Sequence, residues 1–112
     1  AMPDAHRPPI VPACHVSAEA RAVVTHGTDT MVTTGRALAA DARLADKTIV
    51  LTGAMVPYAF GSSDGLFNLG SALSFVQALP PGIYVAMNGR YFPWDSVEKD
   101  RSAGVFVSRA RA

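Results

Sequence analysis

The stretch VVTHGTDTM, residues 23–31, determines how the rest of the chain can be arranged. It opens with β-branched residues, continues as a polar turn with one glycine, several hydroxyls and a carboxylate, and is followed by an amphipathic segment. This order is typical of a buried strand that is followed by a helix. In open α/β sheets, ligands bind beyond the carboxyl ends of the strands. We therefore expect the side chains of this turn to lie at a functional edge.

Around this stretch the sequence predicts alternating strands and helices. The expected strands are residues 22–25, 49–51 and 83–87, and the expected helices are residues 30–44 and from about 64 to the stop at 80–82. The Asn88-Gly89 turn signal permits a hairpin with a short return strand at 91–92, and residues 94–107 are expected mostly as loop. Strands that alternate with helices imply parallel pairing, so the sequence predicts an α/β fold in three layers with a mostly parallel sheet.

The two helices carry predictions about packing. For the first helix, Asp29 or Thr30 is the expected cap, and Gly35 marks close packing. For the second helix, Ser62 or Ser63 with Asp64 is the expected start. The apolar residues at helical spacing are Met31, Leu38 and Ala42 in the first helix, and Leu66, Leu69, Leu73 and Val76 in the second.

Composition narrows the class of protein. The chain has 112 residues and a net charge of +1, and its length predicts one small domain, at 22–112. Four prolines crowd residues 3–12, so we expect an irregular proline-rich arm at 1–21. The late arginines are too few and too scattered for nucleic-acid binding, and no apolar run approaches the ~20 residues of a membrane helix. Cys14 is the only cysteine, so we expect neither a disulfide nor a cysteine metal site. With no recognisable signal peptide, these features predict a cytoplasmic protein.

Four segments in order resemble a known family. Residues 25–31 (THGTDTM) look like the second signature of bacterial-type L-asparaginases, and residues 52–57 (TGAMVP) resemble the family's next loop. Residues 63–69 (SDGLFNL) are similar to the segment that follows, and residues 97–99 (VEK) fit the family's late lysine. The matches are consistent in order and spacing, so the chain resembles an asparaginase N-terminal domain, truncated at its beginning.

The resemblance implies hydrolysis of L-asparagine, or of L-glutamine, to the acid and ammonia without a metal or organic cofactor. It assigns an active-site hydroxyl to Thr28 and assigns to Asp29 a carboxylate that holds the α-amino group of this small-molecule substrate. It makes Lys99 the third member of a Thr-Asp-Lys cluster and places the backbone of Ala54 near the substrate amide.

Two features of the family have no match in this sequence. The family's Thr-Gly-Gly-Thr-Ile motif, which carries its primary threonine nucleophile, is not found, and neither is the serine that binds the substrate carboxylate. Towards the other end, the sequence is similar to short asparaginase-like proteins that end soon after the lysine. The alternative to an amidohydrolase is a non-catalytic protein of this fold that binds a small amino acid or only assembles with itself.

Each candidate residue also has a simpler structural interpretation. A threonine hydroxyl is a poor nucleophile until a base takes its proton, and a lysine with a lowered pKa can serve as that base. Without the resemblance, the sequence favours helix capping for Thr28 and Asp29 and a surface position for Lys99. A hydrogen-bonded core histidine is the expectation for His26. For the remaining residues the expected roles are a cap (Asp64), a packing amide (Asn68), rim or interface aromatics (Tyr58 and Tyr91) and packing (Trp94).

A sheet of three strands leaves edges and apolar faces open. A chain of this size also buries only about two-thirds of its unfolded surface. Both considerations predict a homo-oligomer.

Overall fold

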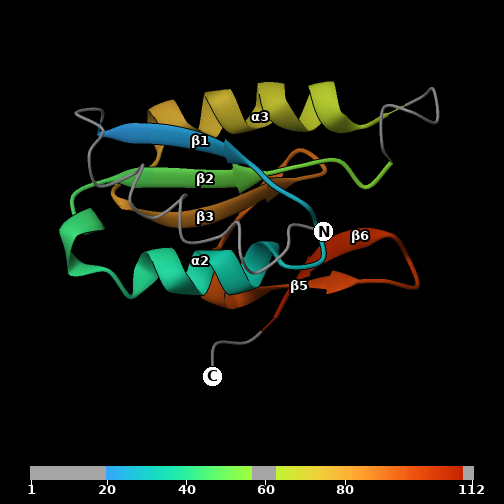
Figure 1. Cartoon of the computed structure of the whole chain (residues 1–112). Helices are drawn as coiled ribbons and strands as arrows, with labels where there is room; N and C mark the ends of the chain where they lie inside the picture. The colour runs from blue at the N-terminus through green and yellow to red at the C-terminus, as the bar shows by residue number, and fades with distance from the viewer. Residues whose placement is uncertain (1–19, 57–62, 110–112) are drawn as a thin grey trace.

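The computed structural model describes residues 20–56 and 63–109 (Figure 1). The predictions on residues 1–19 of the proline-rich arm and on Tyr58 lie outside these residues. The helices are α2 (Met31–Ala39) and α3 (Gly65–Ala78), with short 3₁₀ turns at Ala42–Leu44 and Trp94–Ser96. The strands are β1 (Arg21–Thr25), β2 (Thr48–Thr52), β3 (Gly82–Met87), β4 (Arg90–Pro93), β5 (Val97–Asp100) and β6 (Val105–Ser108).

The main sheet is mostly parallel, as the sequence predicts. It has four strands in the order β1-β2-β3-β4, in which β1, β2 and β3 run parallel and β4 returns antiparallel to β3. Asn88 and Gly89 form the turn before β4 with φ of 59° and 76°, the left-handed conformation that a tight hairpin turn requires. The possible hairpin at 91–92 is therefore confirmed.

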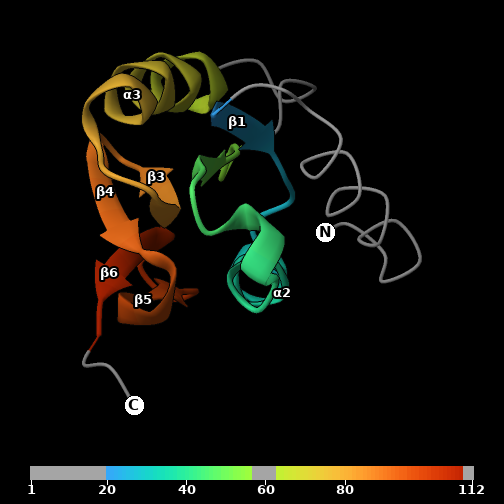
Figure 2. The ribbon, with the colours of Figure 1, turned by 90° about the vertical axis from the view of Figure 1, so that its left-hand side faces the viewer.

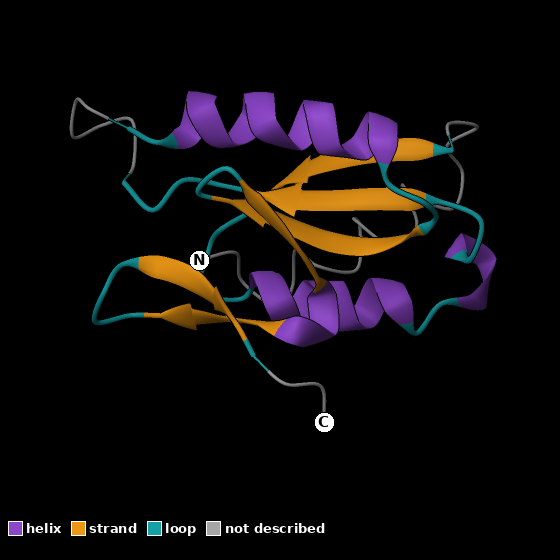
Figure 3. Cartoon of the chain, turned by 180° about the vertical axis from the view of Figure 1, so that it is seen from behind, coloured by secondary structure: helices purple, strands orange, loops and turns teal. Residues whose placement is uncertain are grey.

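Helices cover both faces of this sheet, which gives three layers (Figures 1 and 3). Figure 2 shows α3 on one side of the sheet and α2 on the other, with the β5–β6 hairpin on the same side as α2. Alternate strand residues point into the two cores, as a strand's period of two requires. Ile49 and Leu51 pack towards α2 and the hairpin, whereas Val50 packs towards α3. In the described part of the chain, neither helix is long and apolar enough to cross a membrane.

The first helix is shorter than predicted. It ends at Ala39, because Asp41 has an extended backbone and its side chain accepts a hydrogen bond from the Arg43 amide, which starts a separate 3₁₀ turn. Ala42 is consequently exposed and is not part of the apolar stripe. The packing role of Gly35 is confirmed, because a Cβ at this position would lie 3.1 Å from the Trp94 Cβ.

The predicted apolar stripe of the second helix is right at Val76, which is buried, but wrong at Leu66 and Leu73. Leu66 is 71% exposed and Leu73 is 48% exposed. Besides Val76, the residues that face the sheet are Gly65, Asn68 and Ala72. The helix is apolar on nearly every side, so spacing alone fits two different stripes, and the smaller side chains allow it to lie close to the sheet.

The region after Trp94 is more regular than predicted. Residues 97–100 and 105–108 form an antiparallel hairpin in which Lys99 lies opposite Phe106. The Phe106 ring is buried in the core beside α2, which fixes the hairpin against this helix. Lys99 therefore lies on a strand, where its position is better defined than on a loop.

Candidate active site

Two parallel strands bring their polar carboxyl-terminal turns together. Thr25 of β1 lies opposite Thr52 of β2, and the His26 amide extends this ladder by donating to the Thr52 carbonyl at 2.8 Å. Gly53 passes so close to this turn that a Cβ there would lie only 2.2 Å from the His26 carbonyl oxygen. A glycine is therefore required where the two loops cross, and the loops form one edge of the sheet.

His26 has the structural role expected from the sequence. It is 7% exposed, and both ring nitrogens are in contact with polar groups. The ring Nδ1 donates to the Gly27 carbonyl at 2.6 Å, and Nε2 lies 2.7 Å from the Thr34 hydroxyl on α2. His26 therefore fixes the polar turn onto the helix, and neither nitrogen is left to act as a base.

The structure brings Lys99 to the adjacent residues Thr28 and Asp29, although 71 and 70 positions of the chain separate it from them. The Lys99 ammonium donates to Thr28 Oγ1 at 2.8 Å and to Asp29 Oδ1 at 2.6 Å. The Lys99 side chain is 18% exposed, whereas that of Asp29 is 44% exposed. The cluster thus has one largely covered cation and one carboxylate open to solvent.

Arg101 contributes a second cation to the same carboxylate. Its Nη1 lies 2.5 Å from Asp29 Oδ1, and its side chain is 67% exposed. The hydrogen bond from Lys99, followed by that from Arg101, lowers the pKa of Asp29 from 3.8 to about 2. Asp29 is therefore a carboxylate at neutral pH, as a group that holds an ammonium must be.

The capping alternative for this turn is wrong. The residue at the N-cap of α2 is Thr30, and its side chain makes no capping hydrogen bond. The Thr28 hydroxyl and the Asp29 carboxylate are instead engaged by Lys99. The surface position considered for Lys99 is wrong for the same reason.

The loop after β2 is held by Asp64 and Asn68. The two carboxylate oxygens of Asp64 accept the backbone amides of Met55 and Val56, each at 3.0 Å. Burial disfavours the charged form of Asp64, but these amides outweigh burial and hold its pKa below the usual range. Its side chain does not cap α3, so the predicted cap is instead a clamp on this loop.

Asn68 is fully buried, and its side chain makes three hydrogen bonds with described residues. Its Nδ2 donates to the Gly53 carbonyl at 2.9 Å and to Asp64 Oδ2 at 3.0 Å, and its Oδ1 accepts the Asn88 amide at 3.1 Å. The amide therefore joins the loop after β2 to the turn after β3. The expected packing role is confirmed, with hydrogen bonds as its main contribution.

Ala54 lies on this loop but is not in the cluster. It lines a hollow of about 200 Å³ at the carboxyl ends of β1 and β2, together with residues that include His26 and Leu69. Thr28, Asp29 and Lys99 do not line this hollow. The four residues predicted from the sequence thus occupy one edge of the molecule, with the three charged or hydroxylic groups in contact and Ala54 beside a separate hollow.

The other candidates are placed as follows. Trp94 packs against the core, as predicted, and Tyr91 is 47% exposed. Within residues 20–56 and 63–109, no group of three or more histidine, cysteine or carboxylate side chains could hold a metal ion.

Arg101 was missed at the sequence level, although a signal for it was present. Residues two apart in a strand or its direct extension point to the same side. Had residues 97–100 been predicted as a strand, Arg101 would have been expected on the side of Lys99. The strand was not predicted because three of the four residues at 97–100 are charged.

Comparisons with known proteins agree on one family. A family model described as "Asparaginase, N-terminal" matches residues 14–108. An L-asparaginase of Thermococcus kodakarensis is 41% identical over 83 residues, which cover 74% of this chain and 25% of that protein. The solved structure of the thermostable L-asparaginase from the same organism matches with a TM-score of 0.83 and 33% identity, over 96% of this chain and 34% of that chain.

A second solved structure, the probable cytoplasmic L-asparaginase from Campylobacter jejuni, matches with a TM-score of 0.67 and 38% identity. The match covers 77% of this chain and 28% of that chain. The chain therefore spans about a quarter to a third of the length of the relatives that it matches.

Proposed function

Because the chain belongs to the asparaginase family, whose N-terminal model it matches over residues 14–108, we propose that it hydrolyses the side-chain amide of L-asparagine or L-glutamine. In this reaction an oxygen nucleophile adds to the amide carbon, the carbon–nitrogen bond breaks, and water completes the release of the acid and ammonia. The relatives are named L-asparaginases, which supports this activity over the non-catalytic alternative.

The observation that carries the proposal is the contact of Lys99 with Thr28. At 2.8 Å from Oγ1, the lysine nitrogen is within the distance over which a base takes a proton from a hydroxyl. In its amine form, Lys99 would accept the proton of a hydroxyl or water at this position. Thr28 then has one of two roles: Lys99 takes the proton of its hydroxyl directly, or the hydroxyl passes a proton from the attacking water to Lys99.

Asp29 is proposed to hold the α-ammonium of the substrate. Both cations contact Oδ1, and Oδ2 accepts no hydrogen bond from a described residue. An ammonium could therefore bind at Oδ2 without first displacing Lys99. Ala54 lines the neighbouring hollow, and we assign its backbone to the part of the substrate that carries the amide.

The test is ammonia release from L-asparagine and from L-glutamine by the purified chain. We expect Thr28→Ala and Lys99→Met each to lower the rate by about 100-fold or more, the range for a lost proton-transfer group. Thr33→Ala is the matched control, because Thr33 is an exposed threonine of α2 outside the cluster. An unchanged rate in Thr28→Ala would remove Thr28 from the mechanism, and no ammonia release by the unmodified chain would refute activity of the chain alone.

We also propose that the protein is a homo-oligomer, with the outer face of α3 in contact with a second copy. This face exposes Leu66, Phe67 and Leu73, and the helix contains no charged residue. In a two-fold contact the same element meets itself, so like charges would repel, whereas an uncharged apolar helix would not.

Light scattering tests the oligomer. We expect Leu66→Lys to yield a monomer, because it places like charges at the contact and its side chain is already exposed in the single chain. Thr33→Lys on α2 adds the same charge elsewhere and should leave the oligomer intact. A monomeric unmodified protein at micromolar concentration would refute the proposal.

We place this activity in the cytoplasm. One cysteine permits no disulfide within the chain, as is usual for a reducing compartment, and the Campylobacter jejuni relative is named a cytoplasmic enzyme. Cell fractionation with an antibody to the chain would test the assignment.

A further inference from the structure

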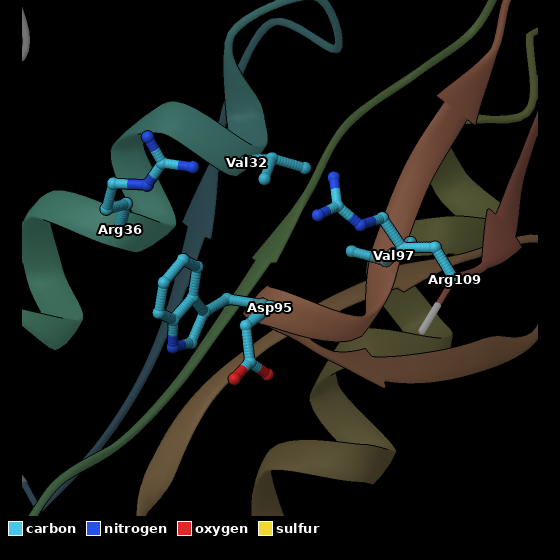
Figure 4. A pocket seen from close by; sticks show the side chains of 6 residues that line it. Val32, Arg36, Asp95, Val97 and Arg109 are labelled. Atoms are coloured by element: carbon cyan, nitrogen blue, oxygen red, sulfur yellow. The ribbon is translucent and has the colours of Figure 1, made fainter. Parts of the chain in front are cut away.

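A second hollow lies between α2 and the segments on either side of the β5–β6 hairpin. Its volume is about 180 Å³, and six residues line it: Val32, Arg36, Trp94, Asp95, Val97 and Arg109. Figure 4 shows Arg36 on α2 and Arg109 on opposite sides of this hollow. None of the lining residues belongs to the cluster of Thr28, Asp29 and Lys99.

Among the residues that the structure describes, the two guanidinium groups at this hollow have no acidic partner. In the described part of the chain, neither Arg36 nor Arg109 forms an ion pair or a side-chain hydrogen bond. Asp95 also lines the hollow, so the described lining residues, with two cations and one carboxylate, leave one excess positive charge there. This imbalance favours a ligand with a single negative charge.

The rest of the lining is apolar. Val32 comes from α2, Val97 begins β5, and Trp94 contributes its large aromatic ring. Trp94 is held in place, because its Cβ lies against Gly35, where an added Cβ would approach to 3.1 Å. A fixed indole is a suitable surface for a flat apolar group.

We propose that this hollow binds a small monocarboxylate with a flat apolar body. The carboxylate would lie between Arg36 and Arg109, since guanidinium groups match carboxylate geometry. The flat body would lie on Trp94 over Val32 and Val97. At about 180 Å³ the hollow is smaller than the ~300 Å³ of a typical ligand pocket, so the ligand is no larger than a single aromatic ring with its acid group.

Such a ligand would join two parts of the fold. Arg36 lies on α2, whereas Arg109 follows β6, and their like charges disfavour a close approach when the hollow is empty. An anion between them replaces this repulsion with attraction. Binding would therefore hold the hairpin that carries Lys99 more firmly against α2.

The experiment uses Trp94, the only tryptophan of the chain, as the reporter. Benzoate is the probe, and its binding should produce a saturable change in tryptophan emission. Benzamide has the same ring without the charge, and acetate has the charge without the ring, so each should bind about threefold to fivefold more weakly, as expected when one exposed ion pair or one ring contact is lost. Free N-acetyltryptophanamide is titrated in parallel to correct for collisional quenching.

Three variants locate the site. Arg36→Gln and Arg109→Gln should each weaken benzoate binding about threefold to fivefold, the range for one exposed ion pair. Arg43→Gln is the matched control, because Arg43 is another exposed arginine, pairs with Asp41 and does not line the hollow. Circular dichroism verifies that each variant is folded. This readout needs no catalysis, so it is independent of the proposed amidohydrolase activity.

Several results would overturn the proposal. These are no saturable signal, equal binding of benzamide or acetate, and an effect of Arg43→Gln as large as that of Arg36→Gln. Inorganic phosphate that binds as tightly as benzoate would show that charge alone is recognised and would refute the aromatic part of the proposal.

Discussion

Asn68→Ala should destabilise the protein more than loss of the other side-chain amide of α3, that of Gln77. Asn68 is fully buried and donates to the Gly53 carbonyl and to Asp64, while it accepts the Asn88 amide. Alanine leaves the Gly53 carbonyl and the Asn88 amide without this partner. A buried polar group that loses its partner costs about 1–3 kcal/mol, and Asn88 is exposed enough for water to replace part of its loss. The sum is about 2–4 kcal/mol, which corresponds to a fall in Tm of roughly 10 °C for a chain of this size.

The assay is urea unfolding followed by circular dichroism, with thermal melting as a second measurement. Gln77→Ala is the control, because Gln77 is an exposed amide of the same helix whose Nε2 donates only within the helix, to the Leu73 carbonyl. We expect this control to change the free energy of unfolding by less than about 0.5 kcal/mol. A loss in Asn68→Ala that is no larger than in Gln77→Ala would refute the argument that the buried amide holds the loop.

Two further predictions concern the site and its glycines. Lys99→Met should raise the pKa of Asp29 from about 2 towards 3.8, as measured by carboxyl NMR, and an unchanged pKa in the variant would contradict the contact. Because the pKa of Asp29 is lowered in the folded protein, the stabilisation from this carboxylate is complete above pH 3.8 and is lost as the pH falls through about 2. Gly53→Ala should cost more than about 2 kcal/mol in urea unfolding, because its Cβ would lie 2.2 Å from the His26 carbonyl oxygen. Gly70→Ala is its counterpart on α3, where a Cβ meets nothing, and should stabilise by about 0.5–1 kcal/mol; equal effects in the two variants would contradict the model of the loop crossing.

The alternation of strands and helices could be predicted because the signals were local. Strand β2 is an apolar run between polar residues, and it is buried along its whole length. The Asn88-Gly89 dipeptide has a positive φ at both positions, so the turn after β3 was encoded in two residues. Local sequence was sufficient where one segment determined its own conformation.

The parts that could not be predicted depend on the partners of a segment. In α3 the stripe of Leu66 and Leu73 and the stripe of Ala72 and Val76 are both compatible with helical spacing. The choice between them depends on how closely the helix approaches the sheet, and residue spacing contains no information on that distance. In β5, Lys99 contacts the turn after β1, and Asp100 accepts the amides of Ser102 and Ala103 in the next turn. These charged side chains make the strand look polar in the sequence.

The same distinction explains the site. Thr28 and Asp29 could be placed at the end of a strand from their neighbours alone, whereas Lys99 was joined to them only by the family resemblance. Its chain separation from Asp29 is 70 residues, and no local pattern reports a contact at that distance. Arg101 had no counterpart in the motifs and therefore remained unpredicted.

One continuous path of contacts joins the separate parts of this site. Asn68 binds the carbonyl of Gly53 and the amide of Asn88, and Asn88 Oδ1 accepts the Phe106 amide at 3.4 Å. Phe106 lies directly opposite Lys99 in the hairpin. If this path positions Lys99, Asn68→Ala will lower the rate of ammonia release even under conditions where circular dichroism shows the variant fully folded. Gln77→Ala should leave the rate unchanged, and equal rates in the folded variants would mean that α2 alone positions the lysine.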